Sequence, residues 1–491
     1  MQAVISHLVP QATVQQVQPV SSVHCQRAYG VKISDGTSLV LVAPPPPMVK
    51  LLRSERASVV SEAAVLSWLA NKTTENPLLQ ERTPEPEDIL DAGKIEIRGG
   101  EDLESTANGA EDLHIFLPRL IAHANTPSEE GREFNLLRPT IGVPIPELSP
   151  PLSSPERRSV DFQTGQFYRR LCRLVSPTGR FGPAFAVLPP ATPIPPPDYA
   201  NSIRRDLNAR LMESRGVQSW STAFHSMLEA VLRDGEDMQV MLGYGSIRQH
   251  FKQFQYTLES VKTPRLVAVD AGKDLNTLVM RRKCRKGPPS LASSQHLELR
   301  GESRVVDDSE SETDDDDSSS ESELGGNDRA TLCQQSNIMM TGMKDWSNFV
   351  FGDPLFAADF CHGPSSDFLS GFNDVSPDQL TNAISAFSSD MIEDKATAHI
   401  RILLYECYHT ITHIAREFFR PRRDSSGREL EARKKLNHIL AQLDTLSDAS
   451  DPSGRRPSGE LSQESALKAA KKMTRESVND TTNQPPVFGR G

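Results

Sequence analysis

The stretch from Ile338 to Phe356, which reads IMMTGMKDWSNFVFGDPLF, contains the pattern that decides the fold. Its apolar start fits a buried strand, and Asp345 follows that strand directly. A turn signal, Gly352-Asp353-Pro354, lies just downstream. A carboxylate at the end of a strand and beside a tight turn is placed to hold a hard cation. The alternative is an ordinary strand and turn in which a buried Asp345 accepts backbone hydrogen bonds.

Length, composition and charge limit the class of protein. With 491 residues, 37% of them hydrophobic, and with 36 prolines, the chain predicts a core of more than one lobe beside unstructured stretches. The formal net charge of -11 argues against general nucleic-acid binding, which needs a basic surface. Six scattered cysteines, without close pairs, predict reduced thiols instead of a zinc site or a disulfide framework.

The location of the protein follows from two missing signals. No apolar run approaches the roughly 18 residues that span a bilayer, so no membrane partner is expected. The N-terminal stretch MQAVISHLVPQATVQQ has no basic region followed by a sustained apolar segment, so no secretory signal is expected. These features predict a cytoplasmic location, with the nucleus as a second possibility.

The N-terminal part predicts strands followed by a helix. Residues 17–42 are rich in strand-forming residues around the turn Ser34-Asp35-Gly36, which predicts an antiparallel hairpin. The prolines within 43–47 end the second strand. Apolar residues recur at helical spacing over 51–69, and this predicted helix carries Glu55 and Glu62.

The C-terminal part predicts mainly helices. A strand over 134–139 leads into a connector, and helices are expected to begin at Ser154, Ser219 and Ser376, with an N-cap hydroxyl at Ser154 and a capping box at Ser376. Further amphipathic helices are expected over 400–414 and 428–443. A small sheet-rich part is therefore followed by a larger helical part.

The spacing from Asp345-Trp346 to Gly352-Asp353-Pro354 resembles the metal-binding segment of the aminoglycoside phosphotransferase and choline kinase-like family, the small-molecule relatives of protein kinases. The phrases SWSTAFHSMLEAVLRD, VKTPRLVAVDAGKDLNTLVM and RILLYECYHTITHIAREFFRPRR are similar to the large-lobe layout of fungal members. The resemblance covers about residues 17–446 without insertions. It implies an α+β, protein-kinase-like fold with a small antiparallel-sheet lobe and a mainly helical large lobe.

The resemblance also implies domain limits. The small lobe is expected over 1–137, with a mobile acidic insertion at 73–112. The large lobe is expected over 138–446, with a disordered basic and acidic insertion at 281–335. Residues 447–491 lack a core pattern and are expected to form a disordered tail.

For the large lobe, the resemblance implies that Asn276 and Asp345 hold Mg²⁺ and that Asp270 positions the acceptor hydroxyl. The family spaces the catalytic Asp five positions before the Asn. Here Ala271 has that position, and Val269 stands where a His is often found. Asp270 acts only if the loop absorbs one extra residue, a freedom that Gly272 provides. The alternative is a decayed loop that serves as a connector.

For the small lobe, the resemblance implies a strand lysine that contacts the nucleotide phosphates, but Val42 has that position. Lys32, on the preceding strand, is the candidate replacement, with a solvated charge as the alternative. Glu62 resembles the partner of the missing lysine, with an ordinary surface residue as the alternative. Both are assigned to the binding of ATP.

The insertion between the two catalytic segments combines a basic run at 281–286 with an acidic, Ser-rich run at 307–323. Ser309, Ser311 and Thr313 each have an acid three positions on, resembling sites of acidophilic kinases, and the basic run resembles a nuclear address. The alternative is a flexible loop whose opposite charges attract each other.

The sequence therefore favours an ATP- and Mg²⁺-dependent phosphotransferase that acts on a hydroxyl of a small molecule. Val42, Val269 and the shifted loop keep a second hypothesis open, a pseudokinase that binds or regulates without phosphoryl transfer. A third hypothesis makes the acidic Ser-rich insertion the functional part, one that binds or is phosphorylated by other proteins.

Overall fold

The computed structural model describes residues 13–74, 111–124, 133–191, 215–282, 338–375 and 389–450. The chain divides into two compact units, Met1–Leu440 and Ala441–Gly491, and the elements of the candidate site belong to the first. The predicted insertions at 73–112 and 281–335, the helix start at Ser376 and the tail at 447–491 lie wholly or mostly outside the described residues.

The strands in the described ranges are as follows: β1 (Val14–Val20), β2 (Arg27–Ile33), β3 (Ser38–Ala43), β4 (Arg119–Ala124), β5 (Phe134–Arg138), β6 (Val143–Pro144), β7 (Gly182–Pro183), β8 (Arg265–Ala268), β9 (Thr277–Arg281), β10 (Ile338–Met343) and β11 (Phe349–Gly352). The α-helices are α2 (Ser58–Thr74), α4 (Ser154–Arg173), α5 (Ala184–Val187), α7 (Trp220–Asp237), α8 (Tyr244–Glu259), α10 (Ala358–Cys361), α11 (Ser366–Asn373), α12 (Ala398–Phe419) and α13 (Ser425–Ser450). Short 3₁₀ helices are η1 (Arg53–Glu55), η3 (Glu111–Phe116), η4 (Ile145–Glu147), η6 (Pro354–Phe356) and η9 (Lys395–Thr397).

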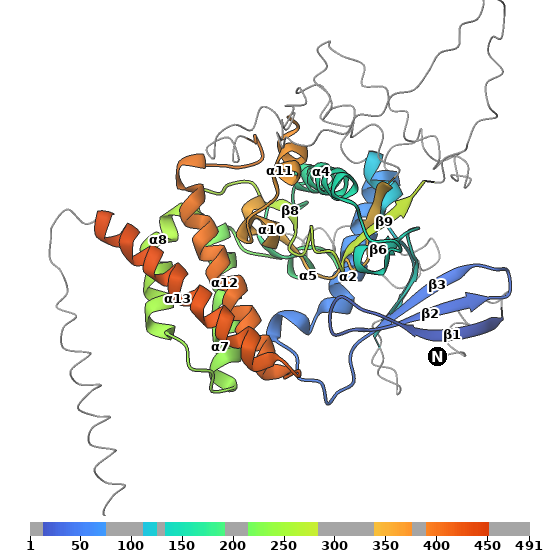
Figure 1. Cartoon of the computed structure of the whole chain (residues 1–491), viewed down its shortest axis with the longest axis horizontal. Coiled ribbons are helices and arrows are strands. Elements are labelled where there is room, and N and C mark those ends of the chain that lie inside the picture. Colours follow the sequence, from blue (N-terminus) through green and yellow to red (C-terminus); the bar gives the residue numbers. More distant parts are fainter. Residues whose placement is uncertain are drawn as a thin grey trace, which may run out of the picture. The chain divides into compact units, whose positions relative to one another are not determined.

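The N-terminal part forms a five-stranded antiparallel sheet with the order β1-β2-β3-β5-β4 (Figure 1). The predicted hairpin is confirmed, because β2 and β3 pair on either side of a turn at Asp35 and Gly36. Gly36 has a φ of +83°, and the Asp35 carboxylate accepts a hydrogen bond of 2.8 Å from the backbone N–H of Thr37. Glycine and aspartate favour this turn for these two reasons.

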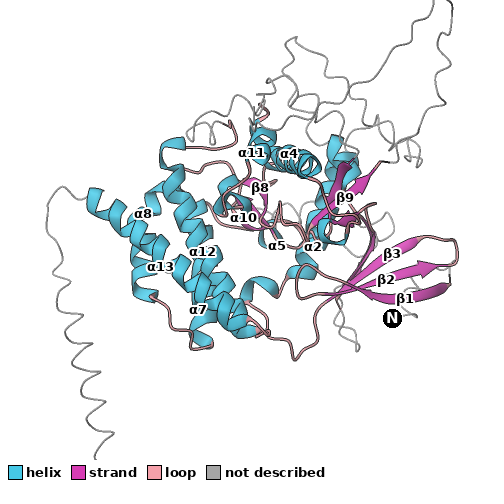
Figure 2. Ribbon diagram, in the orientation of Figure 1, coloured by secondary structure: helices cyan, strands magenta, loops and turns pink. Residues whose placement is uncertain are grey.

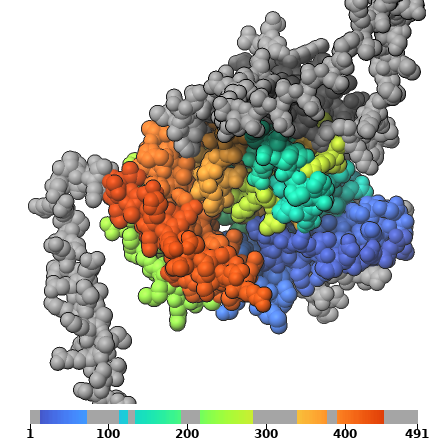
Figure 3. Space-filling view, viewed as in Figure 1, coloured from blue at the N-terminus to red at the C-terminus, as the bar shows by residue number. Residues whose placement is uncertain are grey.

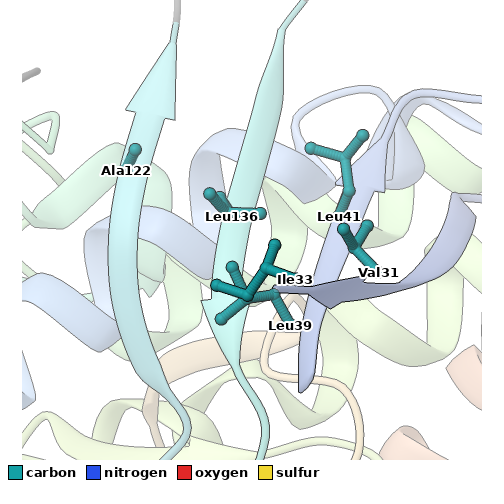
Figure 4. Packing of buried hydrophobic residues seen from close by; sticks show 6 residues of the cluster. All are labelled: Val31, Ile33, Leu39, Leu41, Ala122 and Leu136. Carbon is teal, nitrogen blue, oxygen red and sulfur yellow. The ribbon is translucent and has the colours of Figure 1, made fainter. Parts of the chain in front are cut away.

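One face of this sheet buries a hydrophobic cluster (Figure 4). The residues alternate along the strands, as the pleat of a sheet requires, and they are Val31, Ile33, Leu39, Leu41, Ala122 and Leu136. The opposite face contacts α2, since Asn135 of β5 donates a 2.9 Å hydrogen bond to the carbonyl of Val59. Val42 pairs with Asn135 across the sheet and therefore points to that same face.

The helix predicted over 51–69 begins at Ser58 instead. Residues 53–55 form η1, because Asp234 of α7 accepts hydrogen bonds from both the backbone N–H (2.9 Å) and the guanidinium (2.5 Å) of Arg53. This contact with α7 holds residues 53–55 in a turn of their own, separate from α2.

Helices dominate the rest of the first unit (Figure 2). Helices α7, α8 and α12 contact one another, and α4 packs on α11. The predicted helix start at Ser219 is confirmed, since Ser219 caps α7 and its hydroxyl accepts from Thr222 N at 3.2 Å. The cap of α4 is Ser153, one residue before the predicted position, because Glu156 accepts a 2.8 Å hydrogen bond from the backbone N–H of Ser153. The expected α+β architecture, a small antiparallel sheet followed by a mainly helical part, is confirmed.

Two three-stranded sheets, β10-β9-β6 and β7-β11-β8, lie in the described part of the helical region and bring the candidate site residues together. None of the described helices is long and apolar enough to cross a membrane. The described cysteines, Cys25, Cys172, Cys361 and Cys407, are free thiols, as the sequence predicts.

A buried polar network anchors the Gly352-Asp353-Pro354 turn. Arg401 Nε lies 3.2 Å from Asp353 Oδ2, and the two side chains are 0% and 1% exposed. The hydroxyl of Tyr405 donates to the same oxygen at 2.7 Å and accepts from Trp220 Nε1 at 2.7 Å. The network therefore ties the turn after β11 to α12 and α7.

Replacement of Arg401 by Met is expected to lower the free energy of unfolding by about 3–5 kcal/mol, because it leaves the Asp353 carboxylate buried without its cation. Urea unfolding followed by circular dichroism measures this change. The control, Arg423→Met at an exposed position, is expected to change stability by less than about 0.5 kcal/mol. Equal effects of the two variants would contradict the role given to the network.

Candidate active site

The residues predicted to bind metal, Asn276 and Asp345, are joined by hydrogen bonds. Asn276 ends the loop between β8 and β9, and Asp345 follows β10, which pairs with β9. The backbone N–H of Asp345 donates to Asn276 Oδ1 at 2.8 Å, and Asn276 Nδ2 donates to the Asp345 carbonyl at 3.4 Å. Both residues are buried. This exchange holds two oxygen-bearing side chains at the edge of one sheet.

Asp270, the predicted acceptor-positioning residue, lies in the same loop and is 3% exposed. Its carboxylate contacts the amine of Lys273 and the side-chain amide of Asn348, which follows Asp345 by three residues. The backbone N–H of Val269 donates to the Asn348 carbonyl at 3.1 Å. Asp270 is therefore fixed to the segment that carries Asp345.

The loop after Asp270 turns at Gly272. Gly272 has a φ of +80°, a conformation that other residues rarely adopt. Turn hydrogen bonds run from Lys273 N to the Asp270 carbonyl (3.4 Å) and from Asn276 N to the Lys273 carbonyl (2.8 Å). Gly272 therefore provides the backbone freedom that the sequence assigns to it, and the role of Asp270 stays a prediction.

His24 is a further residue of the site that sequence reasoning missed. It lies in the segment between β1 and β2, and its Nε2 is 3.1 Å from Asp270 Oδ2. The same segment is held by Ser21, whose hydroxyl donates to Glu147 at 2.9 Å and accepts from Lys344 at 2.7 Å. A connection between the first two strands of the sheet thus reaches the loop of Asp270, and its position between β1 and β2 was the only sequence signal for it.

The charges at this point stabilise each other. Burial lowers the pKa of His24, but the negative charges of Asp345 and Asp270 outweigh that effect and raise the pKa above 6.5. Burial raises the pKa of Asp270, but the positive charges of Lys273, His24 and Arg416 outweigh that effect and hold it well below 3.8. The His24 imidazolium therefore provides a positive charge beside two carboxylates.

Glu62 lies on α2, is buried, and faces the position where the family's lysine is replaced by Val42. Asn135 Nδ2 donates to it at 2.9 Å, and the backbone N–H of Trp346 also donates to it. Burial, together with the negative charge of Asp345, raises the pKa of Glu62 from 4.5 to about 8. Glu62 is therefore not a surface residue, and it connects α2 to the segment of Asp345.

Lys32, the candidate phosphate-binding cation, has a different environment. It is exposed near the end of β2, where it pairs with Gln16 and Ser38 beside the Asp35-Gly36 turn. The structure thus brings Asp270, Asn276, Asp345 and Glu62 together and leaves Lys32 on the surface of the sheet.

A cavity of about 1040 Å³, here called the large cavity, adjoins Asp270. Among its lining residues are Val269, Asp270, Lys273 and Asn348, with Met227 and Val231 from α7 and Tyr408, His409 and Arg416 from α12. Arg416 of α12 and Arg420, which follows α12, lie 3.2 and 2.7 Å from Glu55 of η1. Figure 3 shows α12 (orange) next to the blue N-terminal segment. The cavity is large enough for a small organic molecule.

The donor set at the site fits Mg²⁺. Hard cations take carboxylate and amide oxygens, and Asn276 Oδ1 retains a second lone pair besides the one that accepts from Asp345 N. One oxygen of Asp345 accepts from the backbone N–H (2.8 Å) and hydroxyl (2.5 Å) of Ser347, which orients the carboxylate. No group of three or more His, Cys, Asp or Glu side chains that could hold a metal ion is found in the described part of the chain.

The chain is similar to solved structures of phosphotransferases, as the resemblance of the Asp345 segment predicts. The aminoglycoside phosphotransferase APH(4)-Ia, in a ternary complex with ADP and hygromycin B, is 12% identical over 90% of this chain and 98% of that chain, with a TM-score of 0.43. A protein described as a fructosamine-3-kinase, from Thermobifida fusca, is 11% identical over 90% of this chain and 98% of that chain, with a TM-score of 0.43. The GDP complex of aminoglycoside 2'-phosphotransferase-IIIa is 12% identical over 90% and 97%, with a TM-score of 0.41. No family model and no curated protein matches the sequence.

Replacement of Gly272 by Ala tests how the loop is built. Its left-handed φ is expected to cost about 1–2 kcal/mol of stability with any side chain. The new Cβ would in addition meet the carboxylate of Asp359. Gly36→Ala is the matched control, because Gly36 has a φ of +83° and no atom within 4 Å of the added carbon. Chemical unfolding is expected to show a larger loss for Gly272→Ala, and equal losses would contradict the close approach of Asp359.

Replacement of Glu62 by Gln tests the raised pKa of Glu62. Because this pKa is higher in the folded chain, the stabilising contribution of protonated Glu62 is fully present below about pH 4 and is lost as the pH rises toward 8. Glutamine imitates the protonated form at every pH. The stability difference between Glu62→Gln and wild type is therefore expected to grow in favour of the variant from pH 5 to 8, by up to about 1.4 kcal/mol per pH unit. Glu431→Gln, at a side chain that is 71% exposed, is the control, and a constant difference for Glu62→Gln would contradict the assignment.

Proposed function

We propose that the chain is an ATP- and Mg²⁺-dependent phosphotransferase that acts on a hydroxyl of a small molecule. The observation that carries this proposal is the joining of Asp270, Asn276 and Asp345 through direct hydrogen bonds and Asn348 beside the large cavity. Phosphoryl transfer depends mainly on positioning and on charge, and these residues supply both.

Asp270 positions the acceptor hydroxyl. Its carboxylate lines the large cavity, where a hydroxyl can donate to it. With Lys273 and His24 in place, the low pKa of Asp270 makes it a weak proton acceptor. If His24 moved away, Asp270 would lose one of these positive charges. The pKa of Asp270 would then rise, and Asp270 would become a stronger base.

Asn276 and Asp345 would hold Mg²⁺. When bound, this ion would neutralise the charge on the nucleotide phosphates. His24 lies beside both Asp270 and Asp345. A protonated His24 and a bound cation would therefore compete for the negative charge of these two carboxylates. We propose that the segment of His24 moves when a nucleotide enters and that Lys273, three residues after Asp270, provides the cation nearest to the transferred group.

A second candidate function is a pseudokinase that binds without transfer. It is favoured by Val42 in the place of the family's lysine and by the neutral Glu62, whose hydrogen bonds to Asn135 and Trp346 replace that lysine. The two functions differ in phosphoryl transfer and share the fold.

Thermal denaturation with ATP and Mg²⁺, compared with ATP and EDTA, tests the proposal. We expect the metal-nucleotide complex to raise the Tm of wild type, and Asp345→Ala to remove this rise. Asp270→Asn is expected to keep the rise and to lower phosphoryl transfer to a hydroxyl acceptor at least about 100-fold. Asp237→Asn, on the exposed side of α7, is the control and should behave as wild type.

Each contrary result has a distinct meaning. Absence of any Tm rise in wild type would overturn the nucleotide-dependent function. A rise without transfer to any of a broad panel of alcohols would favour the pseudokinase instead.

A further inference from the structure

The walls of the large cavity are mostly hydrocarbon. Met227 and Val231 of α7 form part of one wall, and Val350, Phe356 and Tyr408 form part of another. Phe356 stacks on His409 with ring centroids 5.1 Å apart. A ligand in this cavity therefore meets aromatic and aliphatic surface over much of its body.

Four cationic side chains that line the large cavity each have an acidic partner within the chain. Arg53 lies 2.5 Å from Asp234. Arg416 lies 3.2 Å from Glu55.

Two further cations of the cavity lining, both on α13, also form ion pairs within the chain. Arg428 lies 2.8 Å from Glu417, and Lys435 lies 2.7 Å from Glu406. A charged ligand would have to break such a pair or enter the apolar part of the cavity unpaired, and either is unfavourable.

Two cavity histidines donate to backbone carbonyls through one ring nitrogen and, in their neutral form, offer the other as a hydrogen-bond acceptor. His409 Nε2 lies 2.9 Å from the Phe356 carbonyl and His362 Nδ1 lies 2.6 Å from the Ala358 carbonyl. A carbonyl only accepts, so each of these nitrogens carries the proton and the other ring nitrogen is an acceptor. Burial lowers the pKa of His409 to about 4 and also lowers that of His362. Such acceptors suit hydroxyl groups of a ligand.

We infer that the acceptor molecule is an uncharged alcohol with a bulky apolar body. The inference rests on the proposed function and names the substrate class of the same site. In the reaction, the hydroxyl oxygen of this alcohol bonds to the γ-phosphorus of ATP, and the bond from that phosphorus to the bridging oxygen breaks. ADP leaves with that electron pair, and the hydroxyl proton passes to Asp270 and then to water.

Calorimetric titration of the full chain without nucleotide tests the class of ligand. The probes are 1-adamantanemethanol and 1-adamantanemethylamine, which share one apolar body and differ in a neutral hydroxyl against an ammonium group at pH 7.5. The alcohol is expected to bind at least about tenfold more tightly than the amine. Equal affinities, tighter binding of the amine, or no binding of the alcohol would each overturn the inference.

Met227→Trp locates the binding. Met227 is half-buried and lines the cavity, so the larger ring is expected to fill ligand space and to weaken binding of the alcohol at least about tenfold. Arg233→Trp, at an exposed position of the same helix, is the matched control and should bind as wild type. The unliganded Tm of both variants shows that they fold. Unchanged binding by Met227→Trp would overturn the placement.

The experiments distinguish a wrong ligand class from a wrong phosphotransferase function. If the alcohol binds as expected but no adamantylmethyl phosphate forms with ATP and Mg²⁺, the ligand class stands and the transferase function fails. If the protein phosphorylates the hydroxyl of a polycationic amino sugar and does not bind the neutral alcohol, the function stands and the class is overturned.

Discussion

The hydrogen-bonded exchange between Asn276 and the backbone of Asp345 is the interaction on which the candidate site depends. It joins residues 69 positions apart, and a further hydrogen bond of 2.9 Å runs from Lys344 N to the Asn276 carbonyl. Each such bond contributes only about 1 kcal/mol of net stability. Their structural effect is larger, because they fix the end of the loop after β8 to the end of β10 and so place Asp270 beside Asp345.

The electrostatics of the site depend on charges within the chain. Val42, on the face of the sheet that contacts α2, carries no charge. Burial and Asp345 raise the pKa of Glu62, which accepts a hydrogen bond from Asn135, while His24 and Lys273 place positive charge beside Asp270. A buried group of carboxylates without any of these partners would be unstable. Ion pairs within the chain likewise hold several charged side chains that line the large cavity. The inference of an uncharged ligand rests on these pairs.

Local signals made part of this structure predictable. The Asp35-Gly36 turn and the helix start at Ser219 depend on residues close in sequence, and both are found as expected. Asp345 at the end of its strand was predictable for the same reason.

Contacts between distant segments were not predictable. His24 reaches Asp270 only because the connection after β1 folds toward a loop almost 250 residues away, and the start of α2 at Ser58 depends on Asp234. Asn135 resembles any polar strand residue until its contact with Glu62 is known. The contacts that hold the loop of Asp270 were not predictable either, because they come from Asn348 and His24, which are distant in the sequence.

The most direct test of the central claim is electron paramagnetic resonance of Mn²⁺ titrated into the protein with ATP. If Asn276 and Asp345 are ligands of one cation, wild type lowers the signal of free Mn²⁺ below the level that ATP alone sets, Asn276→Ala and Asp345→Ala do not, and Asp237→Asn behaves as wild type. Equal binding of Mn²⁺ and ATP by all four proteins, or none by wild type, would contradict the claim.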